Sequence, residues 1–260
     1  MTSRKSSRIN QVLQNWPKHT VAVQSWLSEF GVSTKLAQWY VESEWLVRFG
    51  SGAYVRPGDE VQWHGGLYTL QTQMDMTVHV GGLTALQLQG LSHYLPLNTE
   101  AEITLISDVS ERLPAWFEKH NWKAELKHRN ISLFETVPEK SVQDHSFGSF
   151  SIGISSKERA LMEYIRLAGS NEEYHRVYLL MENLTTARPG LVQMLLENCL
   201  SVKVKRLFLW SAEKAGHSWF EHLNLELIDL GKGKRQLFVG GVYDSKYGIT
   251  VPGVEETRNV

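Results

Sequence analysis

Two carboxylates and one ammonium group in the middle of the chain have the residue types of a metal-dependent nuclease. Asp108 directly follows an alternating stretch, and Glu125-Leu126-Lys127 lies downstream. In restriction-fold nucleases such an Asp and Glu bind Mg²⁺, and the Lys activates water or steadies the phosphate. The E-x-K spacing is common in charged chains, however, and residues 118–129 have the composition of a solvated surface stretch. A restriction-fold nuclease is therefore kept as an alternative, and we expect no catalytic residues and no enzyme.

The histidines and glycines indicate no cofactor or metal site. The ten histidines include neither HExxH nor paired Cys/His spacing, so no metal is expected. We expect packed or surface positions for His79, His93, His145 and His175. The stretch "HVGGLTALQLQG" matches neither GxGxxG nor a P-loop, and we interpret it as a turn that opens a buried helix.

A short N-terminal stretch has the residue types that read DNA. Gly31-Val32-Ser33 predicts a tight turn, in which Gly31 adopts positive φ and Ser33 caps the next helix. An amide such as Gln38 pairs with two atoms of adenine, and Lys35 suits guanine or a phosphate. The predicted DNA-binding residues are Ser33, Thr34, Lys35, Gln38 and Trp39 on the turn and helix, Arg48 and Arg56 on the hairpin that follows, and Arg4, Lys5 and Arg8 in an N-terminal arm.

The same helix face also fits a protein-docking module. Trp39 and Glu42 lie on its predicted outer side. An exposed Trp often marks a protein contact, and phosphate repels Glu42 unless that side chain meets a cytosine amine.

Two basic clusters near the C-terminus could bind a phosphate backbone or an acidic partner. Taken separately, each is expected to be solvated, and convergence on one surface would change that expectation. The clusters are Lys203, Lys205 and Arg206 on a predicted helix, and Lys232, Lys234 and Arg235 around a glycine turn.

Hydrophobic periodicity predicts an α+β protein with a small N-terminal domain. Apolar residues at helical spacing indicate helices around residues 9–16, 23–30 and 36–41, and a hairpin follows. This order predicts a winged helix-turn-helix over residues 1–57. The turn-rich stretch 56–60 then leads into a larger mixed α/β body, residues 58–260, with a possible sub-boundary near 154.

The body is predicted to mix helices and strands. We expect helices over 63–74 and 83–89, a strand over 102–107, and a loop or edge strand over 134–140. Three signals each predict the start of a helix: a capping box at Ser155 and Glu158, an N-cap at Asn171, and an early-helix proline at Pro189. A further helix is predicted over residues 203–214. Residues 223–230 and 234–243 have strand-like patterns.

Composition indicates a soluble cytoplasmic protein. The net charge of −1 excludes a bulk nucleic-acid cation, although residues 1–56 carry seven basic and three acidic side chains, a local excess of four. The single cysteine, Cys199, excludes an intramolecular disulfide and suits a reducing cytosol. No stretch approaches the roughly 20 apolar residues of a membrane span.

The chain resembles the AbiEi family of antitoxins from type IV toxin–antitoxin and phage-exclusion systems. Order and spacing carry the resemblance over nearly the whole chain, and Lys157 replaces a proline of the family pattern. The resembling segments are "GVSTKLAQWYVESEWLVRFGSGAYVRPGD", "VHVGGLTALQLQGLSHYL", "SSKERALMEYI", "KVKRLFLWSAE" and "GKGKRQLFVGG".

The resemblance implies a winged N-terminal domain that represses its own operon by binding inverted repeats in double-stranded promoter DNA. It also implies a C-terminal domain that neutralises a nucleotidyltransferase-like toxin without a stable complex, and it implies no cofactor. On this chain the operator would be read by Ser33, Thr34, Lys35 and Gln38, with Arg48 and Arg56 on the wing, and the C-terminal basic clusters would be the candidate antitoxic surface. A winged-helix regulator of a neighbouring operon, without an antitoxin role, is the other alternative.

Overall fold

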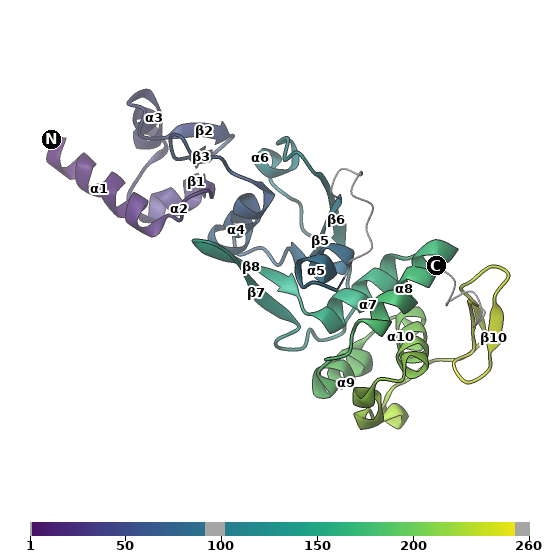
Figure 1. Cartoon of the computed structure of the whole chain (residues 1–260). Helices are drawn as coiled ribbons and strands as arrows, with labels where there is room; N and C mark the ends of the chain where they lie inside the picture. The colour runs from purple at the N-terminus through teal and green to yellow at the C-terminus, as the bar shows by residue number, and fades with distance from the viewer. Residues whose placement is uncertain (1, 92–101, 253–260) are drawn as a thin grey trace.

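The computed structural model describes residues 2–91 and 102–252, and its helices and strands form an elongated molecule (Figure 1). The head, residues 2–57, lies at one end, and a group of helices with a small sheet lies at the other. We use "body" for residues 58–91 and 102–252. His93 and residues 92–95 of the second quoted segment lie outside the described residues.

The head is a winged helix-turn-helix, as the periodicity predicts. Three helices pack against one face of a three-stranded antiparallel sheet of order β1-β3-β2, in which β2 and β3 form the wing. Helix α1 begins at Thr2, so residues 4–8 extend a helix instead of forming an extended arm. The head elements are α1 (Thr2–Asn15), β1 (Ala22–Val23), α2 (Gln24–Glu29), α3 (Thr34–Glu42), β2 (Val47–Gly50) and β3 (Ala53–Val55).

Strands β1 and β3 of the head sheet are buried on both faces. Because side chains alternate along a strand, Ala22 and Tyr54 pack into the core of the head, while Val21, Val23 and Ala53 pack into the core of the body. Helix α4 (Trp63–Gln73) fastens this second face, since Thr69 and Gln73 donate hydrogen bonds to the carbonyl of Val21. The head therefore uses the body as part of its interior.

The wing also contacts the body through an aromatic cluster. A register shift between Arg48 and Gly50 marks a bulge in the wing, and the ring of Phe49 lies 4.3 Å from that of His120, centroid to centroid. Trp116 and Trp122 surround the same ring. A Cβ added to Gly50 would lie 2.6 Å from Cβ of Trp116, so only glycine allows this close approach.

A five-stranded mixed sheet of order β6-β5-β4-β8-β7 forms the centre of the body. Pairs β5–β6 and β4–β8 are parallel, whereas β4–β5 and β7–β8 are antiparallel. The elements are β4 (His79–Val80), α5 (Gly82–Leu88), β5 (Glu102–Ser107), α6 (Ala115–Glu118), β6 (Glu125–Asn130), β7 (Val142–Phe147) and β8 (Phe150–Ser155).

Helices and a small sheet follow the central sheet. The second sheet has the order β10-β11-β9. The elements are α7 (Lys157–Leu167), α8 (Asn171–Glu182), α9 (Pro189–Asn198), α10 (Val202–Ala215), the 3₁₀ helices η1 (Ser218–His222) and η2 (Leu225–Leu227), and β9 (Arg235–Gln236), β10 (Val242–Asp244) and β11 (Ile249–Val251).

Several expectations for the body are confirmed. Strand β5 has the predicted bounds, α9 begins at Pro189, and α10 ends at Gly216, whose φ is +69°. The stretch 134–140 is a loop apart from one bridge between Phe134 and Cys199.

Other expectations were wrong. Ser155 ends β8 and Ser156 caps α7, and Ser170, not Asn171, caps α8. The strand-like residues 225–227 form a 3₁₀ turn. Residues 125–130, expected to be solvated, are partly exposed and form strand β6, which the sequence did not indicate.

Candidate nucleic-acid interface

The turn before α3 has the conformation that its sequence predicts. Gly31 has φ of +73°, Val32 is fully buried, and the Ser33 hydroxyl accepts a hydrogen bond of 3.3 Å from the Leu36 amide. Gln24 fixes the same turn by donating to the carbonyl of Val32 at 2.9 Å. Sequence reasoning missed Gln24, because its role depends on a contact eight residues away.

Helix α3 presents a polar face to solvent. Leu36, Ala37 and Tyr40 are buried in the head, so Lys35 and Gln38 project from the opposite side. A shallow groove of about 490 Å³ runs along this face, and it is lined by Arg8, Ser33, Lys35, Leu36, Gln38, Trp39 and Glu42. The structure thus brings together most of the predicted reading residues on one accessible helix face.

Two side chains on this face contact each other. The Gln38 amide donates to Glu42 at 3.3 Å, one helical turn away. This bond orients Gln38 and gives the Glu42 carboxylate a partner on the protein. Trp39 is 39% exposed, and its ring lies 5.5 Å from that of Tyr40.

The predicted arginines divide into surface and internal residues. Arg48 is exposed on β2. Arg8 is also exposed, and it donates to the carbonyl of Gly31 at 3.2 Å, which ties α1 to the turn before α3. Arg56 instead donates to the carbonyls of Leu13 and Trp16 at the end of α1. Arg4 and Lys5 lie in α1, and their side chains lie outside the described residues.

Arg56 thus serves the fold of the head. Its guanidinium also lies 5.4 Å above the Trp16 ring, and burial lowers its pKa below the ordinary value. The unsatisfied carbonyls at a helix C-terminus attract a cation. Sequence alone places Arg56 on the wing, but only the fold shows that its side chain turns towards α1.

An apolar patch that the sequence did not reveal lies just after α3. Trp45 is 47% exposed and Val47 is 46% exposed. The sequence "EWLV" contains these apolar residues, but the same sequence also fits a fully buried strand. In the structure only Leu46 of this run is buried.

The nuclease residues do not form a site. Strands β5 and β6 are parallel, with Glu125 opposite Glu102 at one end, while Asp108 follows Ser107 at the other end. Six residues of strand place the two carboxylates roughly 20 Å apart, too far to share a metal ion. Lys127 instead pairs with Glu102 at 2.7 Å. Within residues 2–91 and 102–252, no group of three His, Cys, Asp or Glu could hold a metal.

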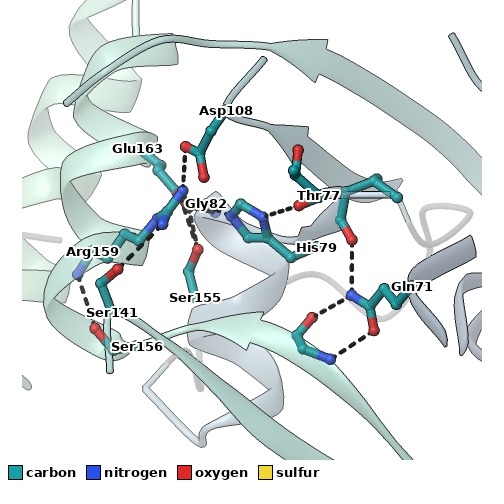
Figure 2. Close-up of polar contacts among 12 residues, drawn as sticks. Gln71, Thr77, His79, Gly82, Asp108, Ser141, Ser155, Ser156, Arg159 and Glu163 are labelled. Carbon is teal, nitrogen blue, oxygen red and sulfur yellow. Dashed lines mark hydrogen bonds and ion pairs between the residues drawn. The ribbon is translucent and has the colours of Figure 1, made fainter. Parts of the chain in front are cut away.

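Asp108 belongs to a buried polar network (Figure 2). Arg159, 1% exposed, donates to Asp108 at 2.6 Å and to Glu163 at 2.7 Å. Glu163 also accepts hydrogen bonds from the Ser155 hydroxyl and the Gly82 amide. The network joins the second and third family-like segments, so these motifs position α5 and α7.

Neighbouring groups stabilise the ionised form of the buried Glu163 carboxylate. Burial alone would raise the pKa of Glu163, but Arg159 and then His79 lower it to about 2. His79 Nε2 lies 3.3 Å from Glu163, and Nδ1 lies 3.0 Å from the carbonyl of Thr77. Both ring nitrogens of His79 therefore lie within hydrogen-bonding distance of acceptors, which fixes the orientation of the ring.

Arg206 connects the two basic clusters, because its guanidinium contacts the loop that carries Lys232, Lys234 and Arg235. Arg206 is 4% exposed and Lys205 is 7% exposed, and the Lys203 ammonium donates to the carbonyl of Ala168 at 2.6 Å. These side chains of α10 are therefore mostly internal. Lys232, Lys234 and Arg235 are exposed, so they alone form the basic surface.

The fold of the head and the exposed face of α3 define a winged-helix protein. One family model, described as "Transcriptional regulator, AbiEi antitoxin, Type IV TA system", matches residues 100–252. A second, described as "Transcriptional regulator, AbiEi antitoxin N-terminal domain", matches residues 5–97. The chain belongs to the AbiEi family of antitoxins of type IV toxin–antitoxin systems.

A solved structure supports the fold. The crystal structure of the RV2827C protein from Mycobacterium tuberculosis is similar, with a TM-score of 0.56, over 95% of this chain and 90% of that chain. Sequence identity is 12%, so this likeness concerns the fold alone. The curated proteins include no significant match. No helix among the described residues is long and apolar enough to cross a membrane.

Proposed function

We propose that this protein is a cytoplasmic antitoxin that represses its own operon by binding inverted repeats in its promoter. The observation that carries the proposal is the exposed polar face of α3, which the Gly31 turn holds clear of the head core. Family membership supports the same role, because the matched models describe transcriptional regulators.

The head is proposed to place α3 in the major groove. Gln38 then reads a base edge and Lys35 contacts guanine or a phosphate, with Ser33, Thr34 and Trp39 beside them. The Gln38–Glu42 hydrogen bond holds the amide side chain in place along the helix. Arg8 and Arg48 contribute charge to the backbone, with Arg4 and Lys5 on the same helix as Arg8, and Arg56 acts indirectly by securing α1.

The body is proposed to oppose a nucleotidyltransferase-like toxin without a stable complex. Its candidate antitoxic surface is the exposed part of the basic clusters, Lys232, Lys234 and Arg235. Arg206 of α10 supports this surface through its hydrogen bonds to the loop, whereas Lys203 and Lys205 are mostly internal. We propose that residues 1–57 bind DNA and residues 58–260 provide antitoxicity. This division concerns function and not folding, because the two parts share one core.

Co-expression with the product of the adjacent gene tests the proposal. The full chain should relieve that protein's toxicity and repress a reporter under its own upstream promoter. Lys35→Ala/Gln38→Ala should lose repression but still relieve toxicity, and Lys214→Ala, an exposed lysine of α10, should retain both activities.

The outcomes separate the candidate functions. Repression without relief of toxicity would favour a regulator of a neighbouring operon that has no antitoxin role. Failure of the wild-type chain in both assays would refute the proposal, and loss of both activities in a folded Lys35→Ala/Gln38→Ala variant would contradict the separation.

A further inference from the structure

The loop that carries the exposed basic residues is built around one buried guanidinium. Arg206 Nε donates to the carbonyl of Leu230 at 2.8 Å, and its terminal nitrogens donate to Gly231 at 3.1 Å, Gly233 at 2.6 Å and Gly248 at 3.2 Å. Four carbonyls from two segments thus converge on one side chain that is 4% exposed. A guanidinium with five donors suits such a convergence.

The direction of these carbonyls, towards Arg206, determines the direction of the amide N–H groups of the loop. In a planar trans peptide, the C=O of one residue and the N–H of the next point in opposite directions. Because the carbonyls of Gly231 and Gly233 face Arg206, the N–H groups of Lys232 and Lys234 face away from it. Neither N–H donates to an acceptor within the described part of the chain.

The two glycines make this conformation possible. Gly231 has φ of +64° and Gly233 has φ of +81°, a region that favours glycine. A Cβ at Gly231 would meet Val202, whereas a Cβ at Gly233 would meet nothing within 4 Å. Position 233 thus favours glycine because of its backbone conformation and not because of crowding.

The surroundings of the loop are cationic. Lys232, Lys234 and Arg235 are exposed, and the Lys234 ammonium lies 5.0 Å from the centroid of the Tyr243 ring. The nearest acidic group on the loop, Asp229, accepts a hydrogen bond of 2.8 Å from the Gly231 amide. Outward backbone amides beside lysine ammonium groups are donors of the kind that bind phosphate.

We propose that Gly231–Arg235 is a phosphate-binding loop, with two backbone amides and the side chains of Lys232 and Lys234 as ligands. Arg206 is its positioning residue and does not touch the phosphate. The inference deepens the proposed function, because it assigns a ligand class to the surface proposed to be antitoxic. Only the antitoxic role of the loop rests on the proposed function. The inference that the loop binds phosphate rests on its geometry.

Backbone NMR of the full chain tests the loop directly. Titration with inorganic phosphate, against sodium chloride at equal ionic strength, should shift the amide resonances of Lys232 and Lys234 in a saturable way. Lys232→Ala and Lys234→Ala should each weaken binding several-fold. Lys214→Ala, which removes the same charge from an exposed site on α10, should leave the binding constant unchanged.

A second variant separates a built loop from simple charge attraction. Gly233→Ala keeps every charge and meets no neighbouring atom, but it disfavours the positive φ that directs the amides. It should lose at least as much phosphate affinity as Lys232→Ala while its melting curve and the amide spectrum of the head remain close to wild type. Equal binding by wild type and Gly233→Ala would overturn the proposal, as would the absence of saturable shifts.

The source of the phosphate is resolved by a second titration. A 12-nucleotide RNA of arbitrary sequence should shift the same amides at far lower concentration than inorganic phosphate if a nucleic-acid backbone is the ligand. Shifts with inorganic phosphate and a nucleoside triphosphate, but not with the RNA, assign the loop to a free phosphate compound. Phosphate binding by a chain that fails to relieve toxicity would refute the proposed function and leave this inference standing.

Discussion

Replacing Glu163 by glutamine should destabilise the protein strongly, although Glu163 lies far from the face of α3. The carboxylate is 1% exposed and accepts from Arg159, Ser155 and the Gly82 amide (Figure 2). A glutamine side chain would keep a similar shape but would leave the buried Arg159 with Asp108 as its only anionic partner. Removing one member of a buried ion pair costs about 3–5 kcal/mol.

The size of the effect can be measured by thermal unfolding. For a chain of this length, 1 kcal/mol corresponds to about 2 °C in Tm. Glu163→Gln should therefore lower Tm by roughly 6–10 °C, as followed by circular dichroism. The matched control is Glu172→Gln, which breaks an exposed i,i+4 pair with Arg176 and should shift Tm by about 1 °C or less.

Equal Tm changes in the two variants would refute this reasoning. Such a result would mean that the buried network tolerates the loss of one of the two anionic partners of Arg159, and that it does not position α5 and α7.

The same geometry leads to four further predictions. Stability should fall as the pH drops from about 4.5 towards 2, because the pKa of Glu163 is lowered to about 2 in the folded state, and acid titration of Glu163→Gln should show a smaller fall. Arg48→Ala should weaken binding to operator and scrambled DNA alike and reduce the salt slope of log K by about 1, as measured by fluorescence anisotropy. Arg56→Ala should instead lower Tm, at a cost of about 1–3 kcal/mol, because two carbonyls at the end of α1 lose their donor, and an unchanged Tm would contradict that role. A fragment of residues 1–57 should show no cooperative melting transition, because the sheet face that packs into the body core becomes exposed, and a sharp transition would contradict the shared core.

The head was predictable from sequence because its signals are local. Apolar residues at helical spacing, a glycine with positive φ and a serine cap all act within a few residues, and Gly31 and Ser33 have the expected conformations. The second buried face of the head sheet was not predictable, because it depends on α4 and on partners more than 40 residues away.

The body was harder to predict because several of its strands are only two residues long or mostly polar. Strand β6 is half exposed and rich in charge, so its pattern resembles a surface stretch. Neighbouring serines at 155 and 156 both suit a helix cap, and only the pairing of β8 with β7 assigns Ser155 to the strand. Local patterns cannot resolve such a choice of one residue.

Buried charge was the main obstacle to predicting the site. Arg206 follows lysines on a helix and resembles a solvated cation, yet its partners are carbonyls of a loop 24 or more residues away. Arg159 and Glu163 lie beside the predicted apolar stripe of α7, and they are buried because Asp108 and His79 approach from other elements. Sequence periodicity identifies apolar faces but does not reveal these non-local partners.

Binding of the full chain to the DNA upstream of its own gene tests the central claim most directly. Fluorescence anisotropy should show salt-sensitive binding that is at least a hundred-fold tighter for the natural sequence than for a scrambled one, a difference of about 3 kcal/mol. Lys35→Ala/Gln38→Ala should abolish most of that preference while melting like the wild type. Equal affinity of the wild-type chain for natural and scrambled DNA, or full preference in the variant, would contradict the assignment of α3 as the reading helix.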